Sequence, residues 1–251
     1  MKITYSDLKK TFPEEKKSVE SLYGIIIPVR KISYFVTIPF LKFGVSAFKV
    51  SVISIVIAII ACAFLCIPNS ICRIIGVILV PIWHLFDCID GNIARYNKTG
   101  SVFGEAVDAI SGYYMYAFLT IALGIASFNI SNNLLGIPSY YFLIMGGLAS
   151  IADLLMRLIH QKYVYAMCQY EVKTGIKQEK GDNQYKLKGW HKIRKMVDVE
   201  LTPVGVPMFI LWLSPIFNLF YILTIFYFIL FSFSLFVMTI YYLRKCHNYD
   251  K

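Results

Sequence analysis

Long stretches of hydrophobic residues recur along this 251-residue chain. Apolar residues follow one another continuously in these stretches instead of alternating with polar ones, which favours membrane-spanning helices over the strands of a β-barrel. A helix also pairs its own backbone polar groups, as the bilayer interior requires. We therefore predict an all-α integral membrane protein with six transmembrane helices, at residues 46–67, 71–95, 104–128, 139–171, 201–217 and 220–243.

The segment before the first predicted span mixes apolar and basic residues. Residues 28–45 combine both kinds, and Pro39 interrupts them. Such a mixture is typical of a helix that lies in the membrane interface. We expect an amphipathic N-terminal helix on the cytoplasmic face. The chain then divides into an N-terminal segment (1–45), one six-helix membrane domain (46–245) and a cytoplasmic tail (246–251).

Charge predicts the orientation of the spans. The chain is 57% hydrophobic and only 16% charged, with a formal net charge of +10. Three predicted loops, 68–72, 129–138 and 214–219, contain no Lys or Arg, whereas the basic residues gather in the other loops and at the two ends. Because cytoplasmic loops of membrane proteins are rich in Lys and Arg, we expect a multi-pass protein of the cell membrane with both termini cytoplasmic.

The charge also indicates partners. The predicted loop at 172–199 is strongly basic, and we expect it to meet anionic lipid headgroups. No basic motif is interleaved with aromatic residues in the way that nucleic-acid modules require, so no nucleic-acid partner is expected.

Acidic residues within the apolar stretches indicate where chemistry takes place. An ionised group at mid-bilayer costs about 2.5–3.5 kcal/mol on insertion scales, so such residues usually face the protein interior and serve a function. Asp87 and Asp90 are three residues apart and share one helix face near the cytoplasmic boundary. Asp108 lies about one turn into the next helix, which is antiparallel, at the same depth. Carboxylates that converge in this way select hard ions such as Mg²⁺, Mn²⁺ or Ca²⁺, which can clamp a pyrophosphate.

The residues around these acids suit a phosphate ligand. Arg95 supplies a fixed positive charge two turns after Asp87. Gly91, Gly104 and Ala94 have small side chains or none, so a ligand can lie close to the backbone.

These residues form one motif, Asp87-x2-Asp90-Gly91-x2-Ala94-Arg95-x8-Gly104-x3-Asp108. The motif resembles the signature of the CDP-alcohol phosphotransferases, also called CDP-alcohol phosphatidyltransferases. The six-helix layout and the interfacial helix are similar to that family too, over most of residues 28–245. Ser46-Ala-Phe-Lys49-Val-Ser51 is similar to the Pro-Asn-x-x-Thr-type element that opens the family's first helix, without its Pro and Asn.

The resemblance implies a function for each position. Asp87, Asp90 and Asp108 would bind a pair of divalent ions, Mg²⁺ or Mn²⁺. CMP would be the leaving group, and the acceptor hydroxyl would attack the phosphate carried by CDP. Members usually form homodimers. The CDP pocket would be lined by Gly91, Ala94, Arg95 and Gly104, with Ser51 as a further candidate.

The sequence departs from the family pattern at one position. A fourth Asp, a metal ligand and general base in the family, should follow Asp108 by four residues, but Gly112 stands there. The number of bound metal ions, one or two, therefore stays open. Three explanations account for the missing Asp. The base could come from Glu105, His84 or Asp153. The acceptor could be anionic and need no base. Or the protein could bind the nucleotide without turning it over.

A second polar group lies on the fourth predicted helix. Asp153, Arg157 and His160 are spaced to share one face. Asp153 and Arg157 either neutralise each other or form an acceptor pocket in which Arg157 holds an anionic group. The basic residues of the N-terminal side could add to that pocket: Lys31, Lys42 and Lys49.

The sequence thus favours metal-dependent transfer of a substituted phosphate from a CDP-linked donor, a CDP-alcohol or CDP-diacylglycerol, to an alcohol or an anionic acceptor. Head-group, inositol-phosphate and polysaccharide-linked acceptors all stay open, and phospholipid biosynthesis is the expected setting. A catalytically inactive CDP-alcohol-binding protein is one alternative. A small-solute transporter is another, but its acids and helix breaks should lie near the midplane in two matching halves.

Overall fold

The computed structural model describes residues 3–12, 28–130, 135–175, 201–202 and 204–249, and every regular element in these ranges is a helix. Five helices are long and apolar enough to cross a membrane. The predicted all-α, multi-pass class is therefore confirmed, with five candidate spans. They are α5 (Ala47–Cys66), α6 (Ser70–Asn97), α7 (Val102–Phe128), α8 (Tyr140–Thr174) and α11 (Phe220–Tyr249).

Polar side chains fix where α6 and α7 begin. The Asn69 side chain accepts hydrogen bonds from the backbone N–H groups of Ile71 (2.9 Å) and Cys72 (3.2 Å). Ser101 Oγ accepts one from the N–H of Gly104 at 3.0 Å. These bonds satisfy backbone donors that the first turn of a helix leaves unpaired. The two helix starts are therefore encoded locally, close to the predicted positions.

A short turn joins α6 to α7. Lys98 adopts a left-handed conformation, with φ of 54°, and the N–H of Thr99 donates to the carbonyl of Ala94 at 2.9 Å. This geometry closes the end of α6. Only residues 98–101 separate the two helices, so they are antiparallel neighbours. We call the end of the bundle that holds this turn the motif end.

The fifth predicted span, 201–217, forms the shorter helix α10 (Pro207–Phe217). Its 11 residues extend about 17 Å at 1.5 Å per residue, against a hydrocarbon core of about 30 Å. Pro207 suits the first turn because its missing N–H has no partner there. Asn218, with φ of 55°, ends the helix. A count of six spans is therefore not confirmed.

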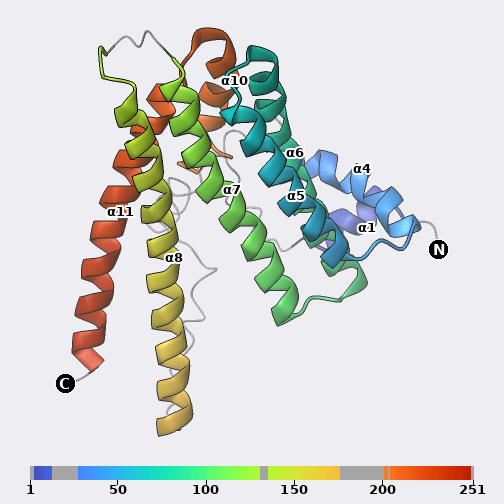
Figure 1. Cartoon of the computed structure of the whole chain (residues 1–251). Helices are drawn as coiled ribbons and strands as arrows, with labels where there is room; N and C mark the ends of the chain where they lie inside the picture. The colour runs from blue at the N-terminus through green and yellow to red at the C-terminus, as the bar shows by residue number, and fades with distance from the viewer. Residues whose placement is uncertain (1–2, 13–27, 131–134, 176–200, 203, 250–251) are drawn as a thin grey trace.

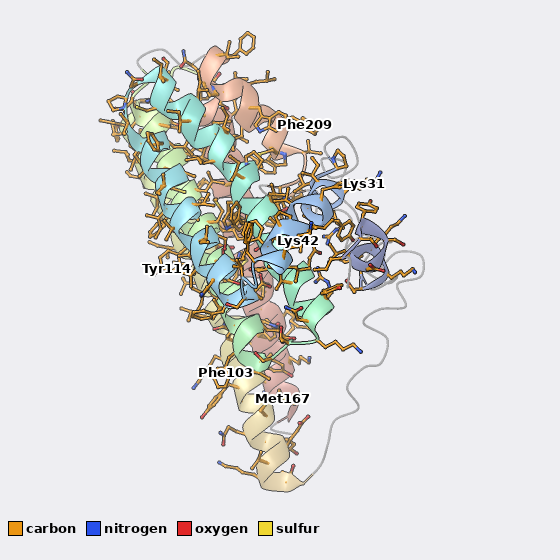
Figure 2. All side chains as sticks on the ribbon, turned by 90° about the vertical axis from the view of Figure 1, so that its right-hand side faces the viewer. Lys31, Lys42, Phe103, Tyr114, Met167 and Phe209 are labelled. Carbon is orange, nitrogen blue, oxygen red and sulfur yellow. The ribbon has the colours of Figure 1, made fainter. Side chains whose placement is uncertain are left out.

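Helix α8 is longer than a span requires, as predicted. Its 35 residues extend about 52 Å at 1.5 Å per residue. The C-terminal part of α8 continues beyond the other helices at the motif end (Figure 1), and Met167 lies on this projecting part (Figure 2). Most of the basic loop predicted at 172–199 lies outside the described residues.

Two glycines allow α7 and α8 to approach closely. A Cβ atom on Gly124 would lie 2.7 Å from the carbonyl oxygen of Phe142, and one on Gly146 would lie 2.7 Å from that of Thr120. Small residues at such crossings are typical of membrane helices, where close backbone contact supplies the packing energy. This crossing sets the position of α8 relative to α7.

Outward-facing side chains of the spans are largely apolar, as contact with lipid requires. Buried residues of α5, α6, α7, α8, α10 and α11 form the main core, which includes Leu65, Val80, Leu119 and Leu123. Large hydrophobic side chains on the outside stay exposed in the isolated chain, among them Val56, Ile78, Ile121, Ile151 and Ile229. An exposed apolar surface of this kind fits a membrane protein.

Two shorter helices lie beside α6, on the side away from α8 and α11 (Figure 1): α1 (Tyr5–Lys10) and α4 (Val29–Lys42). Helix α4 buries Ser33, Tyr34 and Thr37, whereas Lys31 and Lys42 near its two ends are exposed (Figure 2). A helix thus forms in the region predicted to be amphipathic, and Pro39 lies within it. Its location at the membrane interface stays a prediction.

Candidate active site

The three predicted aspartates meet where α6 ends and α7 begins. Asp87 and Asp90 lie one turn apart on α6, and Asp108 lies in the second turn of α7. The carboxyl groups of Asp87 and Asp108 are within hydrogen-bonding distance, and Asp108 is close enough to Asp90 for electrostatic interaction. Asp90 is buried, with 3% of its surface exposed, whereas Asp108 is exposed. The short turn at residues 98–101 produces this meeting.

Two carboxyl groups this close must share a proton or hold a cation between them. Their oxygen atoms suit Mg²⁺ or Mn²⁺ in kind. In the part of the chain that the structure describes, however, no group of three or more His, Cys, Asp or Glu side chains is arranged to hold a metal ion. Asp87 and Asp108 therefore fit a shared cation, and Asp90 would have to turn toward them to join it.

Asp90 points instead to Ser51 on α5, whose hydroxyl donates a 2.6 Å hydrogen bond to Asp90 Oδ2. Nearby, Ser111 Oγ lies 2.7 Å from Ser54 Oγ and accepts a 2.9 Å hydrogen bond from the Trp83 indole N–H. These buried bonds tie α5, α6 and α7 together beside the carboxylates. Ser51, a candidate for the nucleotide pocket, contacts the site through Asp90.

Arg95 lies against the backbone of its own helix. A Cβ atom on Gly91 would lie 2.9 Å from Arg95 Nη1 and 3.1 Å from Nη2, so a side chain there would displace the guanidinium. Arg95 Nη2 donates a 2.8 Å hydrogen bond to Asn92 Oδ1. The Asn92 amide in turn donates to Ser33 (2.9 Å) and Thr37 (3.2 Å) of α4. Gly91 therefore leaves room for Arg95, while Asn92 links Arg95 to α4.

The remaining motif residues are less enclosed. Ala94 is half-buried next to Arg95. Gly104 and Glu105 are both exposed in the first turn of α7.

A family model described as CDP-alcohol phosphatidyltransferase matches residues 45–181, more than half of the chain. The chain belongs to the CDP-alcohol phosphatidyltransferase family. The match includes the whole carboxylate motif together with α5, α6, α7 and α8. Transfer of a phosphate group from a CDP-alcohol is the general activity of this family, which depends on divalent metal ions. No curated protein matches the chain.

Gly112, where the resemblance predicts a fourth Asp, has room for a side chain in the structure. A Cβ atom on Gly112 would meet nothing closer than Tyr116 Cε2, at 3.7 Å. This is an ordinary van der Waals contact. Steric crowding therefore does not explain the glycine.

His84 and Asp153, two candidates for the missing base, have different surroundings. His84 lies on α6, one turn before Asp87, and its buried Nδ1 atom has no hydrogen-bond partner among the residues that the structure describes. Asp153 is buried on α8 and uses both carboxylate oxygens to bind Arg157. An imidazole nitrogen is thus available close to the carboxylates, whereas the Asp153 carboxylate is occupied.

The three polar residues predicted to share one face of α8 contact two different helices, α7 and α11. Asp153 and Arg157 form a two-pronged ion pair with N···O distances of 2.8 and 3.0 Å, and the guanidinium stacks on Tyr113 (4.9 Å) and Tyr116 (5.0 Å) of α7. His160 Nδ1 instead lies 2.5 Å from the hydroxyl of Tyr242 on α11. Lys31, Lys42 and Lys49 are exposed.

Sequence analysis did not single out Arg30, Asn92 or Phe12, which all lie around Arg95. Arg30 is half-buried near the start of α4 and lies within electrostatic range of Asp87 and His84. Their spacing could have indicated this face of the helix, because Arg30, Ser33 and Thr37 lie at i, i+3 and i+7 and so share one side. Residues 28–45 were interpreted only from their mixture of basic and apolar residues, so this spacing was not used.

Proposed function

We propose that this protein transfers a substituted phosphate group from a CDP-linked donor to an acceptor at the cytoplasmic membrane face, and releases CMP. The contact between the Asp87 and Asp108 carboxyl groups, next to an Asp90 that lies within electrostatic range of Arg95, supports this proposal best. Like charges do not gather at a helix junction for stability, because each repels the other. A metal-bound diphosphate between these carboxylates and Arg95 would remove that repulsion.

Each residue has a defined task in this proposal. Asp87, Asp90 and Asp108 would hold Mg²⁺ or Mn²⁺, with the Ser51 hydroxyl orienting the Asp90 carboxylate. When bound, the ion screens the diphosphate charge and stabilises the CMP leaving group. Arg95 binds the diphosphate and keeps the donor phosphorus in line with the acceptor oxygen. The acceptor oxygen forms a bond to that phosphorus, the bond from phosphorus to the CMP oxygen breaks, and the acceptor proton passes to a base.

Two residues compete for the role of base. Glu105 is exposed one turn before Asp108, and His84 presents a buried Nδ1 atom one turn before Asp87. An anionic acceptor that needs no base would instead use Arg157, whose Nη1 atom is outside the two bonds to Asp153. Comparison of Glu105→Gln with His84→Gln decides between the bases. Turnover retained in both variants supports the anionic acceptor.

Release of CMP tests the proposal directly. The purified protein in lipid nanodiscs is given a panel of CDP-linked donors crossed with alcohol and anionic acceptors, in Mg²⁺, Mn²⁺ or EDTA. We expect CMP only with metal, and none from Asp87→Asn or Asp90→Asn. Glu171→Gln, on the projecting part of α8, is the control for loss of one acid. Failure of the wild type to release CMP from any donor would support the inactive-binder alternative.

The proposed sidedness has a separate test. Cys246 is exposed near the C-terminus, in the last turns of α11. With Cys246 as the single cysteine, a membrane-impermeant maleimide should react only after the cytoplasmic side is opened. A cysteine placed at Asn69, between α5 and α6, should react in intact cells. The reverse pattern would overturn the orientation.

A further inference from the structure

We propose that Arg30 of α4 is a second phosphate-binding residue, which together with Arg95 holds the diphosphate of the CDP-linked donor. The inference rests on the proposed function. It extends the nucleotide site from the motif helices α6 and α7 to the N-terminal segment, which lies outside the family match at residues 45–181.

Two guanidinium groups converge on one aromatic ring. The central carbon of the Arg30 guanidinium lies 4.1 Å from the centre of the Phe12 ring, and that of Arg95 lies 5.4 Å from it. Both groups therefore lie within 5.4 Å of one point. Cation–π attraction to the ring favours this placement, but mutual repulsion of the two charges opposes it. Phe12 itself is buried, with 4% of its surface exposed.

Among the described residues, neither Arg30 nor Arg95 forms an ion pair with an acid, although Arg157 forms one with Asp153. Asp87 lies within electrostatic range of Arg30, and Asp90 within that of Arg95. The buried Nε atom of Arg95 has no hydrogen-bond partner in the described part of the chain. Two adjacent guanidinium groups with an unused buried donor suit an anion with several oxygen atoms, and a diphosphate is one.

The position of Arg30 is fixed by contacts elsewhere on α4. Asn92 of α6 donates to Ser33 and Thr37, which share a face of α4 with Arg30. Ser33 Oγ also donates to the backbone carbonyl of Arg30 at 2.8 Å. The same Asn92 side chain accepts the hydrogen bond from Arg95. One buried amide thus aligns both arginines, and Arg30 faces α6 while the adjacent Lys31 is exposed.

Matched variants of adjacent residues test the proposal. Arg30→Gln and Lys31→Gln remove the same charge one residue apart, one from the site and one from the exposed face. Binding of CDP to the full-length protein in nanodiscs with Mg²⁺ is measured by calorimetry. We expect Arg30→Gln to weaken CDP binding by about tenfold or more, because charge-assisted bonds to phosphate are among the stronger polar contacts. Lys31→Gln should bind CDP as the wild type does.

Two further variants keep the test decisive. Arg30→Lys retains the charge without the planar fork and should give an intermediate loss, even if Arg30→Gln does not fold. Phe12→Leu removes the ring between the guanidinium groups and should weaken binding less, by about threefold. In turnover assays, Arg30→Lys should raise KM for the donor more than it lowers kcat, and should leave KM for the acceptor unchanged.

The outcomes separate this inference from the proposed function. CDP binding that is equal in wild type, Arg30→Lys and Lys31→Gln would overturn the role of Arg30, and so would a rise in acceptor KM alone. A wild type that binds CDP but releases no CMP would overturn the transfer reaction, while the binding comparison would still decide on Arg30. A wild type that binds no CDP would overturn both.

Discussion

Two groups of charged residues lie within the helices, and they differ in how their charge is balanced. Asp87, Asp90 and Asp108 are like charges brought together by a short turn, and they raise one another's electrostatic energy. Asp153 and Arg157 are opposite charges joined by two hydrogen bonds and stacked on two tyrosines. The second group is neutralised within the structure, whereas we propose that a ligand balances the first.

This difference indicates which group is built for binding. Mutual neutralisation is a sufficient reason for a polar pair inside a membrane helix. Repulsion between carboxylates has no such structural reason and lowers the stability of the chain unless a cation binds. We therefore expect the aspartates to control turnover, and the Asp153–Arg157 pair to control stability.

The largest expected effect comes from Asp87→Asn. We expect turnover to fall by about a thousandfold or more, ~4 kcal/mol in the barrier, since a metal ligand and a centre of charge stabilisation are lost. The thermal unfolding midpoint should stay the same or rise, because a repulsion is removed. CMP release and thermal unfolding of one preparation measure both. Retained turnover with a lower midpoint would reverse the comparison.

The ion pair of α8 should behave in the opposite way. Asp153→Asn leaves a half-buried guanidinium without its partner, so the free energy of unfolding should fall by about 1–3 kcal/mol. Arg157→Gln should act similarly, and the double variant should lose less than the two single losses together. A double-mutant cycle of unfolding free energies measures the coupling. Additive losses, or a thousandfold loss of turnover, would show that this pair is not a self-contained structural one.

A smaller effect should follow from Ser51→Ala, which removes the 2.6 Å hydrogen bond to Asp90. A net bond to a charged group contributes about 1.5–3 kcal/mol, so we expect turnover to fall by roughly tenfold or more. Ser54→Ala is the matched control, because its hydroxyl contacts Ser111 and no carboxylate in the described structure. Equal losses of turnover in both variants would exclude a special role for the Ser51–Asp90 bond.

The smallest effect should come from Gly112→Asp, which adds a carboxylate one turn after Asp108. Like charges at this spacing destabilise a helix by about 0.2–0.5 kcal/mol, so the unfolding midpoint in EDTA should fall slightly. If the carboxylates bind metal, Mg²⁺ should stabilise this variant more than it stabilises the wild type. Gly112→Ala provides the control without charge. An equal response to Mg²⁺ in all three proteins would contradict a metal site at these residues.

Much of the fold could be predicted from the chain. Continuous apolar runs and local capping residues such as Asn69 and Ser101 place four of the spans within a few residues of α5, α6, α7 and α8. The length of the fifth predicted span could not be predicted from apolar character alone. Residues 201–206 were predicted to belong to it, but the helix begins only at Pro207. Composition measures how apolar a segment is, whereas helix length depends on where the backbone bonds start.

The candidate site, too, could be predicted only where short-range spacing determines it. Spacing indicates that Asp87, Asp90 and Asp108 converge, because one turn and one short loop fix their relative positions. It could not indicate that Asp90 bonds to Ser51, or that Arg157 and His160 face different helices. Those contacts depend on which helices are neighbours. Arg30 was missed for the same reason, since its partner Phe12 is eighteen residues away in the chain and lies just after α1.

The sequence by itself determined the membrane class, the family and the spacing of the three motif aspartates. All of these follow from residue identity and short-range spacing along one or two helices. The tertiary structure decided which charges are balanced. Asp153 is neutralised by Arg157, whereas Arg30 and Arg95 meet at the Phe12 ring and form no ion pair with an acid among the described residues. The physical reason is that electrostatic balance depends on distances across helices, which residue order alone does not specify.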